Sequence, residues 1–307
     1  MPDSVSRNIT FTLDGKKIEA IGSESIWQAA ARHGTDIPHL CYKDANDYRA
    51  DGNCRACMVE IEGERVLAAS CIRTPTEGMV VTSDSHRAET ARKMVMELLV
   101  ADQPARDTAH DPASELWRYA DRQNVSTSRF PAKQAPAPDS SHPAIAVNMD
   151  ACIQCNLCVR ACREVQVNDV IGLAGRGADA HIIFDFDDDM GASTCVGCGE
   201  CVQACPTGAL MPKTLLDDTQ KLAITPDRQV DSVCPYCGVG CQLTFSIKDE
   251  KIVSVAGREG PANKGRLCVK GRYGFDYIDN PERLTAPLIR REDVPKSASM
   301  PFDPANP

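Results

Sequence analysis

The residues with the most evident chemistry in this 307-residue sequence are its 16 cysteines. They fall into four groups of four, with none left over. A disulfide framework needs pairs rather than tetrads, and a reactive-thiol enzyme needs far fewer thiols. Sets of four thiolates are ligands for iron–sulfur clusters or for zinc. The groups are Cys41, Cys54, Cys57 and Cys71; Cys152, Cys155, Cys158 and Cys162; Cys195, Cys198, Cys201 and Cys205; and Cys234, Cys237, Cys241 and Cys268.

The first group has the spacing C-x12-C-x2-C-x13-C, and Gly52 lies close to its second cysteine in the run DGNCRACMVE. A [2Fe–2S] cluster takes four thiolates from a loop that wraps its core, and glycine lets backbone amides approach the sulfurs. Zinc is the alternative, but zinc usually takes paired C-x2-C knuckles, whereas here one pair is flanked by two single cysteines. The spacing therefore favours a [2Fe–2S] cluster on Cys41, Cys54, Cys57 and Cys71.

The second and third groups share the spacing C-x2-C-x2-C-x3-C at an offset of 43 residues, so they form an internal repeat. This is the two-cluster bacterial ferredoxin pattern, in which the fourth cysteine of each run typically ligates the other cluster. Zinc has no reason to need eight cysteines in two such runs. Two clusters in one small domain suit electron relay. We assign one [4Fe–4S] cluster to Cys152, Cys155, Cys158 and Cys205, and another to Cys162, Cys195, Cys198 and Cys201.

Charge and hydropathy exclude other classes of function. The net charge of −9 makes the chain a poor candidate for binding nucleic acid. The N-terminus lacks the basic and apolar regions of a secretory signal, and no run reaches the ~18 apolar residues of a membrane helix. We therefore expect a soluble cytoplasmic protein without membrane insertion. In that compartment clustered cysteines are metal ligands rather than disulfides.

The elements that position the first group are predicted to be those of a β-grasp ferredoxin. NITFTLDGKKIEAIG alternates apolar and polar residues about Asp14-Gly15, which predicts a hairpin. A helix should follow, with Ser23 or Ser25 as its N-cap. Its buried face is expected to carry Ile26, Ala29 and Ala30.

The rest of the N-terminal segment predicts two more short strands, CMVEIEG and ERVLAASC, and a closing helix. That helix, SDSHRAETARKMVMELLVADQ, is amphipathic, with Met94, Leu98 and Val100 among its apolar positions. Further on, HIIFDFDDD predicts a strand that enters an acidic loop, and CQLTFSIKDEKIVSVAG predicts a hairpin with its turn at 248–250. Trp27 and Trp117 are expected to be packing residues.

Composition predicts an α+β, multidomain chain. Residues 124–147 are rich in Pro, Ala and Ser and predict a linker, and the last 22 residues hold five prolines and no cysteine. The expected domains are a β-grasp [2Fe–2S] domain at 1–100, a helical connector and linker at 101–147, a two-cluster ferredoxin-type domain at 148–222, a small domain with the fourth cysteine group at 223–285 and an extended tail at 286–307.

The N-terminal segment resembles the ferredoxin domain shared by the large iron–sulfur subunit of respiratory complex I, iron hydrogenases and NAD-dependent formate dehydrogenases. In several of these relatives a His-plus-three-Cys cluster motif follows the closing helix. This sequence departs from that pattern, because VADQPARDTAHDPASELWRYADRQ contains His110 but no cysteine. The additional cluster should therefore be absent, and His110 is expected to be an ordinary loop histidine.

The fourth group has the spacing C-x2-C-x3-C-x26-C within the motifs CPYCGVGC and CVKGR. It resembles the N-terminal [4Fe–4S] domain of the molybdopterin oxidoreductase superfamily, and the match is closest to formate dehydrogenases. The resemblance implies one [4Fe–4S] cluster on Cys234, Cys237, Cys241 and Cys268. It also implies that Lys270, two residues after the last cysteine, assists electron passage between cluster and pterin. The alternative is an exposed lysine in a glycine turn.

Together the motifs, from Ile9 to about Arg291, resemble the alpha subunit of NAD-dependent molybdenum or tungsten formate dehydrogenases. That resemblance implies oxidation of formate to carbon dioxide at a bis-guanylyl molybdopterin centre. Electrons would pass through the clusters to a subunit with flavin and iron–sulfur centres that reduces NAD. The catalytic domains of that family lie downstream of the fourth group, and no cysteine follows Cys268 and no histidine follows His181. We therefore expect an electron-transfer module without catalytic residues or formate dehydrogenase activity of its own.

Two other classes of function stay open. One is a non-catalytic electron carrier or diaphorase subunit of a hydrogenase-type complex, although such a subunit has no need of the fourth cysteine group. The other is a zinc-stabilised scaffold protein. If all four clusters load, each adds about −2 to the charge, which would take the chain from −9 to roughly −17.

Overall fold

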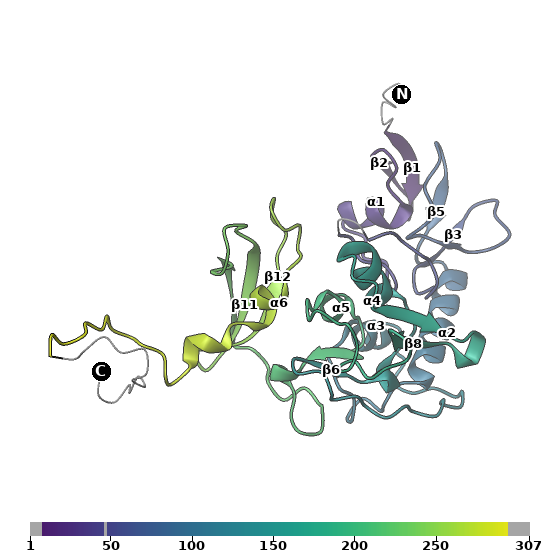
Figure 1. The fold of residues 1–307 in the computed structure, drawn as a ribbon. Coiled ribbons are helices and arrows are strands. Elements are labelled where there is room, and N and C mark those ends of the chain that lie inside the picture. The colour runs from purple at the N-terminus through teal and green to yellow at the C-terminus, as the bar shows by residue number, and fades with distance from the viewer. Residues whose placement is uncertain (1–7, 46–47, 294–307) are drawn as a thin grey trace.

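The computed structural model describes residues 8–45 and 48–293, which form three units in chain order (Figure 1). The first two units pack together, and the third, a small sheet with a short helix, lies beside the second. Residues 286–293 have no helix or strand and are exposed. The remainder of the predicted tail, 294–307, lies outside the described residues.

A five-stranded mixed sheet forms the N-terminal unit, with the strand order β2-β1-β5-β3-β4. β1 and β5 are parallel, whereas the other neighbours are antiparallel. Its core holds the inward side chains of these strands and of the first helix. The strands are β1 (Ile9–Leu13), β2 (Lys16–Ala20), β3 (Met58–Ile61), β4 (Ala68–Ala69) and β5 (Val80–Thr82).

The predicted hairpin and first helix are both present. Asp14 and Gly15 have φ angles of 48° and 76°, the paired left-handed residues of a tight hairpin turn. Helix α1 (Ile26–Arg32) begins after Ser25, whose hydroxyl accepts the Gln28 N–H while the Gln28 side chain accepts the Ser25 N–H. This capping box selects Ser25 as the N-cap.

The closing helix of the N-terminal segment, α2 (His86–Ala101), is also confirmed, but only one of the three apolar positions predicted for it is buried. Val100 is buried, whereas Met94 and Leu98 are 36% and 49% exposed. Arg92 is on the buried face instead, because its guanidinium donates to two backbone carbonyl oxygens at 2.5 and 2.9 Å. The buried face of α2 thus carries Ala88, Arg92, Met96 and Val100, and the hydrogen bonds of Arg92 allow one charged side chain to lie among three apolar ones.

Helix α3 (Glu115–Arg122) packs against α2 and carries Trp117 into a second core. Trp27 and Trp117 are 7% and 2% exposed, so both are packing residues as predicted. None of the described helices combines the length and the hydropathy that crossing a membrane requires.

The central unit consists of two small sheets and several short helices around one core that contains most of the second and third cysteine groups. The predicted strand of HIIFDFDDD is present and ends at the acidic loop. The regular elements are β6 (Ile145–Val147), α4 (Leu157–Arg160), a π-helix η2 (Ala161–Val165), β7 (Ile171–Ala174), β8 (His181–Phe184), α5 (Glu200–Ala204) and β9 (Leu210–Pro212), with 3-10 turns η1 (Met149–Ala151), η3 (Gly177–Asp179) and η4 (Lys213–Leu215).

The end of the predicted linker differs from expectation. Residues 145–147 form β6, all three are buried, and they pair antiparallel with β9. The preceding Asp139 also forms an isolated bridge with Val147. A run of small and apolar residues thus becomes a strand because a partner 65 residues away in the chain supplies its hydrogen bonds.

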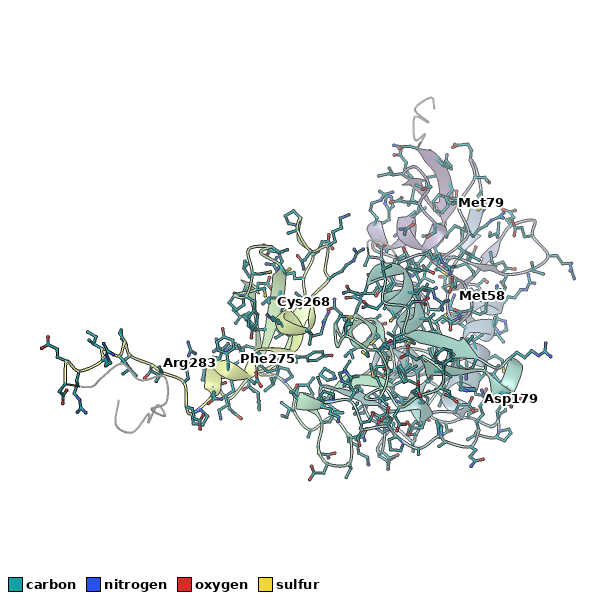
Figure 2. The ribbon with its side chains drawn as sticks, viewed as in Figure 1. Met58, Met79, Asp179, Cys268, Phe275 and Arg283 are labelled. Carbon is teal, nitrogen blue, oxygen red and sulfur yellow. The ribbon has the colours of Figure 1, made fainter. Side chains whose placement is uncertain are left out.

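The C-terminal unit is a three-stranded antiparallel sheet followed by a short helix. The predicted hairpin turns at Asp249 and Glu250, whose φ angles of 49° and 61° are again left-handed. Past the helix the chain leads through Phe275 and Arg283 away from the other units (Figure 2). The elements are β10 (Arg228–Val233), β11 (Gln242–Lys248), β12 (Lys251–Gly257), α6 (Val269–Tyr273) and η5 (Asp276–Asp279).

Candidate iron–sulfur centres

The first cysteine group comes together where the loop before β3 meets the end of β4. The Cys41 sulfur contacts the thiols of Cys54 and Cys71, and the Cys57 thiol contacts that of Cys71. The backbone N–H of Cys54 donates to the Cys41 sulfur at 3.5 Å. The structure therefore gathers all four residues of the predicted set, and all but Cys54 are buried.

Gly52 has the role that its position in the loop suggests. Its φ of 63° is left-handed, and a Cβ there would lie 2.9 Å from the Ile72 side chain. The residue after Cys54, Arg55, also has a left-handed φ of 59°. These turns direct backbone N–H groups toward sulfur, which is the arrangement that a wrapped [2Fe–2S] core needs.

The second group lies in a loop that runs from η1 into α4. Its first three cysteines line a small cavity together with Cys205, the last cysteine of the third group. Cys162, the fourth cysteine of its own run, is not among the residues that line this cavity. The Gln154 N–H donates to the Cys152 sulfur at 3.4 Å.

Cys162 lies instead near Cys195, Cys198 and Cys201, the first three cysteines of the third group. Burial raises the pKa of these three thiols, and the charge of Cys162 is close enough to raise it further. The Val170 N–H donates to the Cys162 sulfur at 3.3 Å, and the Gly197 N–H donates to the Cys195 sulfur at 3.4 Å. The structure thus places the fourth cysteine of each run beside the opposite run.

The two runs repeat in backbone as well as in sequence. Gln154 and Gly197, 43 residues apart, have φ angles of 53° and 65°, and each donates its N–H to the first cysteine of its run. Asn156 and Gly199, also 43 residues apart, have φ angles of 61° and 70° and precede α4 and α5. Left-handed residues between the cysteines curl both loops so that three sulfurs face one space.

Close packing is a second reason why position 199 requires glycine. A Cβ there would lie 2.2 Å from the Arg272 side chain and 2.5 Å from the Tyr273 hydroxyl. These residues belong to α6 of the C-terminal unit. The loop of the third group is therefore covered at Gly199 by the C-terminal unit.

The fourth group is the most open of the four. Cys234 is buried and its N–H donates to the Cys241 carbonyl oxygen at 2.8 Å, whereas Cys237 and Cys268 are exposed. Burial raises the pKa of Cys241, and the charges of Cys234, Cys237 and Cys268 raise it further, so these three cysteines lie near Cys241. Cys268 precedes α6 and lies within the C-terminal unit in Figure 2.

Lys270 follows Cys268 in α6. Its side chain is exposed and has no hydrogen bond or ion pair to any residue that the structure describes. Its predicted part in electron passage stays a prediction.

Burial raises the pKa of most of the cysteine thiols. It raises the pKa of Cys152 to about 11 and that of Cys158 and Cys201 well above the ordinary value. In the first group, contacts with the thiols of Cys54 and Cys71 lower the pKa of Cys41 to about 2. A buried thiolate needs a positive partner, and a metal core deprotonates its thiol ligands outright.

Within residues 8–45 and 48–293, no three His, Cys, Asp or Glu side chains are placed to hold one ion. Backbone N–H groups donate to the sulfurs of Cys41, Cys152, Cys162 and Cys195. Thiolates with backbone N–H donors are the usual surroundings of an iron–sulfur core. The residues present therefore fit iron–sulfur cores.

Three family models match the chain. A 2Fe-2S iron-sulfur cluster binding domain matches residues 6–86, a 4Fe-4S dicluster domain matches residues 151–209, and a molybdopterin oxidoreductase Fe4S4 domain matches residues 227–280. The chain is a row of three iron–sulfur cluster-binding domains. The N-terminal, central and C-terminal units are accordingly the 2Fe-2S domain, the dicluster domain and the Fe4S4 domain, and the predicted fold class is confirmed.

Curated relatives share nearly the whole chain. An NADH-quinone oxidoreductase subunit of Rhizobium meliloti is 34% identical over 92% of this chain and 33% of its own length. The NADPH-Fe(3+) oxidoreductase subunit alpha of Geobacter sulfurreducens is 31% identical over 95% of this chain and 34% of its own. A Staphylococcus haemolyticus protein named "Putative formate dehydrogenase" is 25% identical over 94% and 33%. The chain spans about a third of the length of these relatives.

A solved structure is similar too. A chain of the NAD+-reducing [NiFe]-hydrogenase in the H2-reduced state matches with a TM-score of 0.59 and 28% identity. The match covers 67% of this chain and 87% of the hydrogenase chain. The fold of about two thirds of this chain is thus also found in a chain of a hydrogenase.

Sequence reasoning missed the charged residues buried between the domains. Arg160, Glu200 and Arg272 are each at most 3% exposed and connect one domain to another. One signal was available: Arg160 is a charged residue inside the apolar segment between two cysteines of its run, where a solvated arginine has no place.

Proposed function

We propose that this chain is an iron–sulfur electron-transfer module of an NAD-linked oxidoreductase, in which each cysteine group holds one cluster. The observation that carries the proposal is the crossed arrangement of the dicluster domain, where Cys205 lines one cavity with Cys152, Cys155 and Cys158. Crossed ligation ties two centres into one small core and keeps them close.

The proposed ligand sets follow the groups that the structure gathers. When bound, iron–sulfur clusters accept and release one electron at a time. The chain itself supplies buried thiols, backbone N–H donors to sulfur and a packed protein environment that excludes water. The sets are Cys41, Cys54, Cys57 and Cys71 for [2Fe–2S]; Cys152, Cys155, Cys158 and Cys205, then Cys162, Cys195, Cys198 and Cys201, for two [4Fe–4S] clusters; and Cys234, Cys237, Cys241 and Cys268 for a third.

Metal analysis of the anaerobically purified chain tests this proposal. We expect about 14 irons per chain with matching acid-labile sulfide, and EPR signals of both cluster types after reduction. Replacing Cys57 by Ser should remove the [2Fe–2S] signal and leave the others. A preparation reconstituted with iron and sulfide that holds only zinc would refute the proposal in favour of the scaffold alternative.

Within this class, we propose that the intact enzyme is a formate dehydrogenase. The Fe4S4 domain, the motifs CPYCGVGC and CVKGR and the name of the staphylococcal relative support it. The partners would be molybdopterin catalytic domains with molybdenum or tungsten and a flavin- and iron–sulfur-containing NAD-reducing subunit. Lys270, exposed beside Cys268, is free to meet such a catalytic domain.

A second candidate is an electron-transfer subunit that serves a hydrogenase, favoured by the similarity to the NAD+-reducing hydrogenase chain. The two candidates differ in the reductant. We expect formate, and not hydrogen, to bleach the cluster absorbance of the chain in its native complex. The isolated 307-residue chain should reduce no dye with formate. Bleaching by hydrogen alone would favour the hydrogenase candidate.

A further inference from the structure

Two arginines are buried at the junctions between the domains. Arg160, on α4 of the dicluster domain, is 1% exposed, and Arg272, on α6 of the Fe4S4 domain, is 3% exposed. Arginines are almost never buried to this extent unless their charge and their N–H groups are used. The hydrogen bonds and ion pairs of each arginine should therefore account for its burial.

Arg160 connects the first cysteine group with the second. Its Nη2 donates to the Cys41 carbonyl oxygen at 2.6 Å and approaches the Cys155 carbonyl oxygen at 3.4 Å. Its Nη1 forms an ion pair with Asp51 of the 2Fe-2S domain. One guanidinium thus touches the backbone of two cysteines from different domains.

Arg272 connects the third group with the fourth. Its Nε donates to the Cys198 carbonyl oxygen at 2.8 Å, and its backbone N–H donates to the Cys268 carbonyl oxygen at 3.1 Å. Its Nη2 pairs with Glu200 at 3.4 Å, and its Nη1 donates to Gln203 at 2.6 Å. This arginine likewise spans cysteines from two domains.

The two junctions are related by the internal repeat. Cys155 and Cys198, whose carbonyl oxygens receive the arginines, are 43 residues apart and are each the second cysteine of a run. Arg160 and Gln203 are also 43 residues apart, and both reach across a domain boundary: Gln203 donates to the Gly257 carbonyl oxygen at 3.1 Å. Each repeat of the dicluster domain therefore contacts one neighbouring domain, and an arginine donates to the carbonyl oxygen of the second cysteine in both repeats.

Each arginine is paired with a carboxylate. Asp51 pairs with Arg160 and also with Arg49, and Glu200 pairs with Arg272 while accepting a hydrogen bond from the Tyr48 hydroxyl at 2.9 Å. Each guanidinium also donates to a cysteine carbonyl oxygen, that of Cys41 for Arg160 and that of Cys198 for Arg272. A planar guanidinium with several fixed donors can hold two such oxygens at once, which a lysine ammonium on a flexible stem does poorly.

We propose that Arg160 and Arg272 are positioning residues for electron transfer between domains. Each sets the separation of two neighbouring centres and supplies the hydrogen-bonded connection between their cysteine backbones. The proposal rests on the proposed function, because it assigns the junctions a purpose only if the cysteine groups hold redox centres.

Flash photoreduction of the cluster-loaded full chain tests the Arg160 junction. Electron equilibration between the [2Fe–2S] and [4Fe–4S] clusters is followed by absorbance, and its rate is compared in four variants: wild type, Arg160→Lys, the charge-balanced double variant Arg160→Met with Asp51→Asn, and Arg176→Gln. The last is a control, since Arg176 is an exposed arginine of the same domain that lies before η3, 14 residues from the nearest cysteine in sequence. Changes next to metal ligands typically cost 10–100-fold, so we expect both Arg160 variants to be about tenfold slower with unchanged iron and the control to match wild type.

EPR gives an independent readout. The magnetic broadening of the [2Fe–2S] signal by its reduced neighbour should weaken in both Arg160 variants, and that of the Fe4S4-domain signal should weaken in Arg272→Lys. Wild-type rates and broadening in loaded variants would overturn the inference but leave the proposed function intact. Loss of iron from every Arg160 variant would overturn it too, because a positioning role requires centres that load without the arginine. A wild-type chain that binds no clusters refutes the proposed function itself.

Discussion

His110 is held through both nitrogens of its ring. Nδ1 lies 2.8 Å from the Gln220 carbonyl oxygen and Nε2 lies 3.0 Å from the Asp150 carboxylate, so the side chain ties the connector to the dicluster domain. It was expected to be an ordinary loop histidine, but it is 9% exposed. Both nitrogens face acceptor oxygens, so both can donate only when the ring is protonated.

This pair predicts a pH-dependent stability. Burial lowers the pKa of His110. Its hydrogen bonds to the Asp150 carboxylate and the Gln220 carbonyl oxygen raise the pKa more, and the charge of Lys221 lowers it slightly, so the net pKa is above the ordinary value. A raised folded-state pKa means that the stabilisation is complete below about pH 6.5 and is lost as the pH rises through the folded pKa. We expect His110→Gln to lower the unfolding free energy by about 1.5 kcal/mol at pH 6 and by less at pH 8.5.

Thermal unfolding of the loaded chain at the two pH values measures this difference. His86→Gln is the control, because His86 is an exposed residue at the start of α2. An equal loss of stability at pH 6 and pH 8.5 would show that the His110 charge contributes nothing.

At the scale of elements, turn residues and capping residues in the sequence correctly predict where hairpins turn and where a helix begins. Asp14-Gly15 and Asp249-Glu250 form hairpin turns with left-handed backbones, and each joins strands that the alternation of residues predicts. The face of α2 and the strand β6 were not predictable in this way. Both depend on partners far away in the chain, for β6 the residues of β9.

The capping box of α1 offers a test at this scale. Ser25→Ala removes the hydroxyl that accepts the Gln28 N–H and should destabilise the 2Fe-2S domain by about 1 kcal/mol. Ser23→Ala is the matched control, since Ser23 is exposed and is not the N-cap. Urea denaturation monitored by circular dichroism measures both variants. Equal midpoints for the two would contradict the assignment of Ser25 as the N-cap.

At the scale of the whole molecule, Glu200 joins all three domains. It lies in the dicluster domain, accepts from Tyr48 of the 2Fe-2S domain at 2.9 Å and pairs with Arg272 of the Fe4S4 domain at 3.4 Å. Both side chains of the ion pair are at most 4% exposed. Removing one partner of such a pair leaves a buried charge without compensation.

We therefore expect Glu200→Ala to destabilise the loaded chain by about 3–5 kcal/mol. Tyr48→Phe should cost only about 1 kcal/mol, because it removes one hydrogen bond to the same carboxylate. Glu164→Ala is the control, since its partner Arg49 is 64% exposed and surface pairs contribute about 0–1 kcal/mol. Urea unfolding curves give all three values, and a Glu200→Ala midpoint no lower than that of Glu164→Ala would refute the expectation.

The sequence by itself determined the four cysteine groups, the order of the domains' motifs and most of the local elements. Ligand spacing, turn residues and capping residues act over a few positions, so they can be read along the chain. Spacing also predicted that Cys205 joins the second group, and the cavity that they share agrees with it. Only the tertiary structure decided which charges are buried at the junctions between the domains. Arg160 looks like any surface arginine until Cys41, 119 residues away in sequence, is brought beside it.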